Sequence, residues 1–182
     1  MKTTLWFSHP DQDKPIVNKM ILEKINSLDL LLDVRNLDQL YPDFNINVAI
    51  EQDILRKTDR IILLFPVYWV GMPSLLTHWR EKVFLKDFAY TEPNFDKNSE
   101  LKNKELIVIM TLGAPESAYS KDGFIQEEFS QYTKWIEAMV LFTGMKLLKI
   151  SPFFKSNITI NQDKSILDKR INNFVKDIFD HY

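Results

Sequence analysis

A continuous apolar run, Ile61–Phe65, is followed at once by Pro66, by two aromatic residues and then by a segment of helical periodicity that begins at Pro73. An uninterrupted apolar run of this length is typical of a strand buried on both faces of a parallel sheet. Proline cannot donate to a sheet ladder, so we expect the strand to end at Pro66. Open α/β sheets bind ligands where their strands open into loops at the carboxyl ends. This stretch therefore predicts both a fold class and the place of a binding site.

The same succession of buried strand and amphipathic helix runs along the whole chain. Strands that alternate with helices, joined by right-handed crossovers, form a doubly wound parallel sheet, here of five strands in the order 2-1-3-4-5. We expect residues 1–182 to form a single domain, because 182 residues is an ordinary domain length. The predicted strands are 3–7, 30–35, 61–65, 106–112 and 145–151, and the predicted helices are 13–25, 48–57, 73–84, 124–142 and 162–181. Residues 36–45 are predicted to be a loop, and residues 86–104 a long aromatic excursion.

The composition excludes several kinds of site. The chain has no cysteine, so disulfides, thiolate metal sites and cysteine nucleophiles are absent. Its four glycines are too far apart for a G-x-G-x-x-G or P-loop motif. With only three histidines, we expect no metal site.

Charge and hydropathy limit the partners and the cellular location that we expect. The net charge of −2 gives no electrostatic reason to bind nucleic acid or an anionic membrane. The apolar run at the N-terminus is too short for a signal peptide or a membrane span. We therefore expect a cytoplasmic protein.

Three loops follow strands that are adjacent in the predicted sheet: Ser8–Asn18, Pro66–Met72 and Thr111–Tyr119. Because the switch point lies between strands one and three, these loops should converge. The first loop supplies the backbone N–H groups of a helix N-terminus, which can hold an anion such as phosphate. The second supplies two aromatic rings, and the third a glycine turn with a tyrosine. Together they suit a planar ring that carries a phosphate tail.

Several motifs occur in an order that resembles one family. They are His9-Pro10, Gln39–Ile46 with Glu51-Gln52, Phe65–Pro73, Trp79–Phe84, Phe88-Ala89-Tyr90, and Thr111-Leu112-Gly113 followed by Tyr119. From residue 2 to about residue 154 the chain is similar to the flavodoxin-like NAD(P)H:quinone oxidoreductases. This family includes the ancillary flavoproteins of glutathione-gated potassium efflux systems. The resemblance implies a flavodoxin-like three-layer sandwich.

The resemblance also implies a bound FMN, with FAD as the alternative, and NAD(P)H as co-substrate. Hydride would pass from the nicotinamide to the flavin and then to a quinone-like acceptor in the same pocket. The catalytic residue would be Tyr119, over the substrate face. The implied cofactor-binding residues are His9, Pro15, Ile16, Val17 and Asn18 at the phosphate, Pro66, Val67, Tyr68 and Trp69 at the flavin ring, with Trp69 beside it, and Thr111, Leu112, Gly113 and Ala114 on the far side.

Three positions depart from the family pattern. Pro15 stands where the family usually has a serine that donates to the phosphate, and Ala114 replaces a second glycine. Ile125 stands where some relatives have a catalytic histidine, so Tyr119 would act alone.

Two other functions stay open. One is a regulatory flavoprotein that binds a potassium-efflux transporter at the inner face of the membrane, which the Tyr41–Ile46 motif favours. The other is an azo- or nitroreductase, which shares the chemistry and differs in the acceptor.

We also expect a homodimer, because the excursion at Phe88–Phe95 could complete the pocket of a partner subunit. Trp6, Trp79 and Trp135 are expected to pack in the core.

Overall fold

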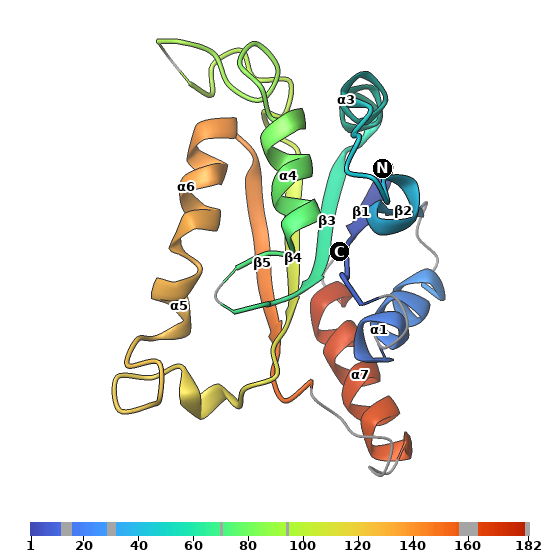
Figure 1. Cartoon of the computed structure of the whole chain (residues 1–182), viewed down its shortest axis with the longest axis vertical. Helices are drawn as coiled ribbons and strands as arrows, with labels where there is room; N and C mark the ends of the chain where they lie inside the picture. The colour runs from blue at the N-terminus through green and yellow to red at the C-terminus, as the bar shows by residue number, and fades with distance from the viewer. Residues whose placement is uncertain (12–15, 29–31, 70, 94, 157–163, 181–182) are drawn as a thin grey trace.

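The computed structural model describes residues 1–11, 16–28, 32–69, 71–93, 95–156 and 164–180. Its parallel sheet has five strands in the order β2-β1-β3-β4-β5, which confirms the predicted doubly wound, flavodoxin-like topology (Figure 1). The strands are β1 Thr3–Phe7, β2 Leu32–Asn36, β3 Arg60–Pro66, β4 Glu105–Thr111 and β5 Lys146–Phe153. The helices are α1 Ile16–Asn26, α2 Leu37–Leu40, α3 Val48–Lys57, α4 Ser74–Val83, α5 Phe129–Tyr132, α6 Lys134–Thr143 and α7 Lys164–Phe179, with a 3₁₀ turn at Glu116–Ala118.

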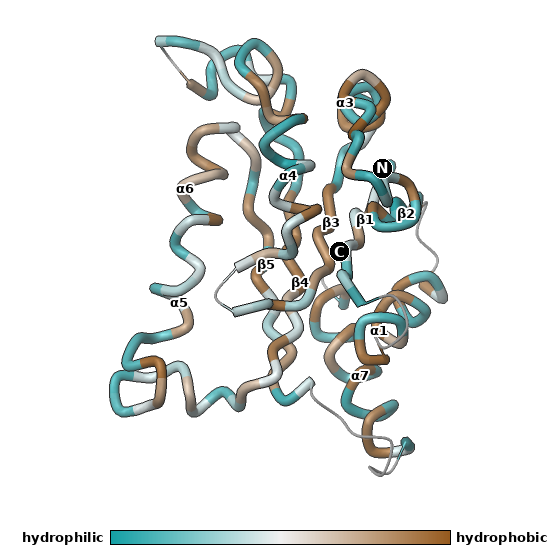
Figure 2. Tube along the Cα trace, in the orientation of Figure 1, coloured by the Kyte–Doolittle hydropathy of each residue, from teal (hydrophilic) through white to brown (hydrophobic). Residues whose placement is uncertain are grey.

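Helices cover both faces of the sheet and make three layers. α1 and α7 lie side by side on one face, and α4 and α6 lie on the other (Figure 1). In β3, Ile62 and Leu64 pack in the core under α1 and α7, whereas Leu63 and Phe65 pack in the opposite core. Figure 2 shows the resulting hydrophobic colour along β3 and β4. The central strands therefore read as unbroken apolar runs because both of their faces are buried.

The central strand extends one residue beyond its predicted range at each end. Pro66 belongs to β3 and is paired with Thr111 of β4. The following N–H, that of Val67, donates to the carbonyl oxygen of Thr111 at 2.8 Å. The missing N–H of Pro66 therefore does not end the ladder, because the next residue supplies the donor.

Two segments are more broken than the sequence pattern predicts. The predicted loop 36–45 contains the short helix α2, whose N-cap Asn36 accepts a hydrogen bond from the Gln39 N–H. The predicted helix 124–142 is two helices that meet at Thr133, and residues 124–128 are not helical. Apolar periodicity alone does not reveal such capping and breaks, because they depend on local hydrogen bonds of side chains and backbone.

The buried face of α7 also differs from the one that the sequence predicts. The apolar pattern of the sequence predicts that Ile166 points inward together with Ile171 and Ile178, but 61% of its surface is exposed, whereas Leu167 is buried. The buried residues Leu167, Ile171, Val175 and Ile178 are spaced by four, four and three residues, which keeps them on one helix face. Ile166 is one position off this stripe and so lies about 100° around the helix. The predicted ends of this helix, at 162 and 181, lie outside the described residues, as do Asp13, Pro15, Leu30 and Leu31.

The segment 86–104 lies at the amino end of the sheet. Asn103 N–H donates to the Gly144 carbonyl at 2.8 Å, and the Lys104 Nζ donates to the Thr58 carbonyl at 2.6 Å. In Figure 1 this segment is at the top, whereas the loop after β4 is at the bottom. The excursion therefore cannot cover the carboxyl-end loops of its own chain.

A buried carboxylate ties four elements together on the α3–α4 face. Glu51 has no exposed surface, and its Oε2 accepts hydrogen bonds from the indole N–H of Trp6 at 2.8 Å and of Trp79 at 2.9 Å. Its Oε1 accepts from the Tyr41 hydroxyl at 2.6 Å and forms an ion pair with Arg35. Trp6 and Trp79 are buried, as predicted, whereas Trp135 is half-buried.

Candidate functional site

The three predicted loops lie side by side at the carboxyl edge of the sheet. After β1, the Ser8 N–H donates to the carbonyl oxygen of Leu64 in β3. After β3, the Val67 N–H donates to Thr111, and after β4 the Leu112 N–H donates to Phe153 of β5. Each loop is thus anchored to the neighbouring strand, and the binding edge is continuous from β1 to β5.

His9 is fixed by two acidic neighbours in the first loop. Its backbone N–H donates to the Asp38 carboxylate at 2.8 Å, and its ring Nδ1 accepts from the Asp11 N–H at 3.2 Å. Burial lowers the pKa of His9 below 6.5, although hydrogen bonding to Asp11 and the charges of Asp11 and Asp38 act in the opposite direction. Because Nδ1 is an acceptor, the neutral imidazole carries its proton on Nε2, where it can serve as a donor.

Two buried polar atoms flank the turn between β1 and α1. The hydroxyl oxygen Oγ of Ser8 and the amide nitrogen Nδ2 of Asn18 have no hydrogen-bond partner among the described residues. Ser8 has no exposed surface and Asn18 is 2% exposed. Buried donors are almost always satisfied in native proteins, so such a pair needs an explanation. Two donors beside a helix N-terminus have the chemistry that holds a phosphate group, so these residues fit the phosphate end of a flavin nucleotide.

The other residues predicted at the phosphate are placed as follows. Val17 is buried, and Ile16 is 44% exposed at the first described position of α1. Pro15 lies outside the described residues, so its role stays a prediction.

The second loop presents its aromatic residues to solvent. Tyr68 and Gly71 exchange two backbone hydrogen bonds of 3.1 Å, which closes a tight turn. Trp69 lies within this turn, with φ of 54° and 95% of its surface exposed. The ring of Tyr68 meets that of His9 edge-on, with 5.9 Å between the ring centroids. A bulky residue at positive φ is strained, and strain of this kind collects at ligand-binding sites.

The third loop begins with buried residues and becomes more exposed at its turn. Thr111 and Leu112 are buried, whereas Gly113 and Ala114 are half-buried. The carbonyl oxygen of Ala114 accepts from the Lys155 N–H at 3.1 Å, which joins this loop to the segment after β5. The loop is therefore bonded to the segment after β3 through Thr111 and to the segment after β5 through Ala114.

Tyr119 lies inside an aromatic cluster at the end of the third loop. Its ring is 5.6 Å from each of the rings of Phe129, Tyr132 and Phe154, and only 8% of its surface is exposed. Burial raises the pKa of Tyr119, so its hydroxyl stays protonated at neutral pH. The structure therefore places Tyr119 beside the third loop with its ring enclosed.

Sequence reasoning missed several residues of this edge. Tyr132 is one: its buried hydroxyl has no partner among the described residues, and burial, together with the nearby Tyr119, raises its pKa to about 12. Asp38 is another: together with Pro42 and Phe44 of the Gln39–Ile46 motif, it lines a cavity of about 250 Å³ beside the first loop. No sequence signal marks Tyr132, whereas Ser8 could have been noticed because it directly precedes the His9 motif.

Among the described residues, no group of three or more histidine, cysteine, aspartate or glutamate residues is arranged to hold a metal ion. Within the same residues, no helix combines the length and the apolar character needed to cross a bilayer.

A family model described as a flavodoxin-like fold matches residues 1–178. The chain belongs to this flavodoxin-like family. The flavodoxin-like chain is 32% identical over 178 residues to an NAD(P)H oxidoreductase, YdeQ, of Bacillus subtilis, and the match covers 98% of this chain and 86% of the relative. It is also 32% identical over 174 residues to the glutathione-regulated potassium-efflux system ancillary protein KefF of Klebsiella pneumoniae, with 96% and 93% covered.

Solved structures repeat the same architecture. The general stress protein 14 of Treponema denticola, solved in complex with FMN, matches this flavodoxin-like chain with a TM-score of 0.84 and 23% identity. The match covers 100% of this chain and 97% of that one. At this identity the likeness establishes the fold alone.

Proposed function

We propose that this flavodoxin-like protein is an FMN-dependent NAD(P)H oxidoreductase that reduces a quinone-like acceptor. The observation that carries the proposal is a pair of buried donors, Ser8 Oγ and Asn18 Nδ2, that have no partner among the described residues at the turn that opens α1. The relatives support it, since one is named an NAD(P)H oxidoreductase and one solved neighbour contains FMN.

The first loop would hold the phosphate. Ser8 and Asn18 donate from side chains that are already buried, so little conformational entropy is lost on binding. The backbone N–H groups that begin α1 add the positive end of the helix dipole, and His9 adds a neutral imidazole donor. Pro15 has no N–H, so a phosphate bound here depends more on Ser8 and Asn18 than it would with serine at position 15.

The second and third loops would hold the ring. The backbone of Pro66–Tyr68 borders one edge, the exposed Trp69 lies against the ring, and Thr111–Ala114 borders the other side. When bound, the flavin supplies the capacity to accept and to donate a hydride. The chain orients the two reacting rings and excludes water, and Tyr119 keeps its hydroxyl proton at neutral pH because burial raises its pKa.

The variant Ser8→Ala tests the phosphate site. It replaces an unpaired buried hydroxyl by a hydrogen, so the unliganded protein should keep its thermal midpoint. FMN affinity should fall roughly tenfold, as expected for a lost hydrogen bond to a charged group. Riboflavin, which lacks the phosphate, should bind both forms equally. The measurement is the quenching of flavin fluorescence, with the absorption spectrum recorded before and after NADPH is added.

A pair of charge-introducing substitutions provides the control. Asn18→Asp places a carboxylate in the first turn of α1 and should abolish FMN binding, whereas Asn26→Asp, exposed at the other end of the same helix, should not. The proposal fails if the protein neither binds FMN nor bleaches it with a nicotinamide cofactor.

A regulatory role at a potassium-efflux transporter is the second candidate. The relative named KefF favours it, together with the Tyr41–Ile46 motif. Phe44 in that motif is 44% exposed, so its ring is available to a partner. In this role the protein would work at the inner face of the membrane. Co-purification with a transporter that is lost on Phe44→Ser, while quinone reduction is kept, would favour this role over an independent enzyme.

The acceptor is the remaining alternative within the enzyme class. Azo dyes and nitroaromatics are reduced by the same hydride chemistry as quinones. Turnover of benzoquinone, an azo dye and a nitroarene at equal concentration ranks the three, and we expect the quinone to be fastest because the loops offer flat aromatic surfaces and few charges.

We also propose that the protein is a homodimer. A groove of about 500 Å³ lies between α4, α6 and the segment 86–104, and it is lined largely by aromatic and apolar side chains. They include Phe84, Tyr90, Phe95, Trp135, Met139 and Phe142. Because segment 86–104 lies away from the site of its own chain, a second copy is what would bring its aromatic residues to a flavin pocket.

A further inference from the structure

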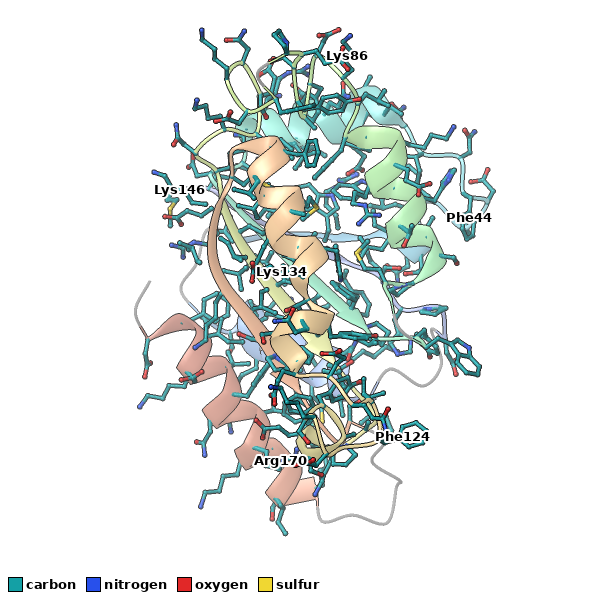
Figure 3. The ribbon with its side chains drawn as sticks, turned by 90° about the vertical axis from the view of Figure 1, so that its left-hand side faces the viewer. Phe44, Lys86, Phe124, Lys134, Lys146 and Arg170 are labelled. Carbon is teal, nitrogen blue, oxygen red and sulfur yellow. The ribbon has the colours of Figure 1, made fainter. Side chains whose placement is uncertain are left out.

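A groove of about 590 Å³ runs between the loop after β4 and the helix α7. It is lined on one side by Glu116 and Ser117, at its base by Phe154 and Lys155, and on the other side by Arg170 and Phe174. Figure 3 shows Arg170 at the end of the molecule that carries this loop. The groove thus has two cations and one carboxylate among its lining residues, with aromatic surface between them.

Arg170 is held in place although it is exposed. Its Nη2 donates to the carbonyl oxygen of Phe154 at 3.0 Å, and its guanidinium lies 4.8 Å from the ring centroid of Phe153. Two such contacts reduce the side-chain entropy that an arginine loses when it binds a ligand. Its other N–H groups keep the planar geometry that matches phosphate oxygens.

The groove is also joined to the proposed flavin site. Lys155 follows β5, and its backbone N–H bonds to the carbonyl oxygen of Ala114 in the third loop. Ser156 N–H bonds in the same way to Leu112 at 2.8 Å. The third loop therefore borders both the proposed flavin site and this groove.

We propose that this groove binds the adenosine end of NADPH and selects NADPH over NADH through its 2′-phosphate. The proposal rests on the proposed oxidoreductase function. Arg170 and Lys155 would bind the phosphate, and the aromatic surface of Phe154 and Phe174 would hold the adenine. Glu116 would accept a hydrogen bond from a ribose hydroxyl, a pairing of carboxylate and sugar that recurs in dinucleotide sites, where an arginine accommodates the 2′-phosphate.

Direct binding tests the groove without the flavin reaction. Isothermal titration of the full chain with adenosine 2′,5′-bisphosphate should give saturable binding, tighter than that of adenosine 5′-monophosphate. Arg170→Gln should weaken bisphosphate binding roughly tenfold, the usual effect of losing a charge-assisted hydrogen bond. Lys169→Gln removes the same charge from the neighbouring exposed position of α7, which does not line the groove, and should have little effect.

Two further variants guard against a simple folding defect. Lys155→Gln should weaken the bisphosphate in the same sense as Arg170→Gln, whereas Glu116→Gln should strengthen it, because a like charge is removed. In steady-state assays Arg170→Gln should raise the KM for NADPH about tenfold, leave the KM for NADH nearly unchanged, and leave kcat with both unchanged.

The proposal is overturned if the bisphosphate does not bind, or if Arg170→Gln and Lys169→Gln behave alike. These results are separate from the test of function. If the Arg170→Gln variant binds FMN and oxidises NADPH normally, the oxidoreductase function stands and the proposed role of the groove in NADPH binding is refuted. A chain that binds the bisphosphate but no flavin would keep the groove and lose the oxidoreductase assignment.

Discussion

At the scale of single residues, the buried carboxylate of Glu51 is an electrostatic centre of the core, with four side chains hydrogen-bonded to it. Burial alone would raise its pKa, but the hydrogen bonds from Arg35, Trp6, Tyr41 and Trp79 outweigh burial and lower the pKa below 4.5. Because the carboxylate is charged and fully enclosed, removing it leaves Arg35 without its buried counter-ion. Breaking one side of a buried ion pair is costly, whereas exposed pairs contribute little.

We expect Glu51→Gln to lower the free energy of unfolding by about 3 kcal/mol. Urea denaturation at neutral pH measures this loss. Glu23→Gln, on the exposed surface of α1, is the matched control and should change the stability by less than about 0.5 kcal/mol. Equal stability of the two variants would show that the four contacts to Glu51 carry no net energy.

The same group predicts a dependence of stability on pH. Since the pKa of Glu51 is lower in the folded state than its ordinary value of 4.5, its stabilisation is fully present above pH 4.5. It is lost as the pH falls through the folded-state pKa. The difference in unfolding free energy between the wild type and Glu51→Gln should therefore be constant from about pH 5.5, roughly one pH unit above the ordinary pKa, up to pH 7. Below pH 4.5 this difference should shrink.

At the scale of elements, the loop after β4 depends on a close backbone approach. A Cβ atom at Gly123 would lie 2.4 Å from the Ser117 carbonyl oxygen and 2.6 Å from that of Ala118. The Ile125 N–H bonds to the same Ala118 oxygen at 2.9 Å, so the turn closes directly onto the segment that positions Tyr119. Only glycine fits this approach without a backbone shift.

Gly123→Ala should therefore lower the stability by about 2 kcal/mol and weaken FMN binding, because overpacked backbone must move. Thermal unfolding and flavin titration measure the two effects. Gly71→Ala is the control, since its added Cβ would meet nothing within 4 Å. If both variants melt at the wild-type temperature, the loop is more adaptable than its contacts indicate.

At the scale of the whole molecule, apolar surface is gathered on the face of α6 and the segment 86–104. Leu141 is 77% exposed and Phe142 is 50% exposed, and the Phe142 ring packs edge-on against Phe95 with 4.8 Å between their centroids. Contiguous apolar surface of this kind marks an interface more often than a free face.

Light scattering should give twice the 21.5 kDa chain mass for the wild type and the monomer mass for Leu141→Glu. The substitution is exposed in the monomer, so the monomer should remain folded. Ile166→Glu, at an exposed position of α7 away from the groove, should leave the dimer intact. A wild-type protein that elutes as a monomer at all concentrations would refute the dimer.

Much of the architecture is encoded locally. β1 and α3 have the predicted bounds, and β3 and β4 differ from theirs by one residue at each end, because a strand buried on both faces reads as an apolar run. The predicted convergence of the three loops follows from the strand order. Capping by Asn36 and the break at Thr133 were not predicted, because they depend on single hydrogen bonds rather than on periodicity.

The sequence by itself determined the succession of elements, the sheet topology and the loops that meet at its carboxyl edge, because these follow from hydrophobic periodicity and chain connectivity. Only the tertiary structure decided which side chains meet, in the core and at this edge. The contacts of Glu51 with Trp6 and Trp79 join residues 45 and 28 positions apart, and Arg170 reaches Phe154 over 16. The enclosure of Tyr119 is likewise a property of packing, as is the burial of the donors Ser8 and Asn18 without a partner in the part of the chain that the structure describes. Such pairings depend on how helices lie against the sheet, and no local pattern encodes that geometry.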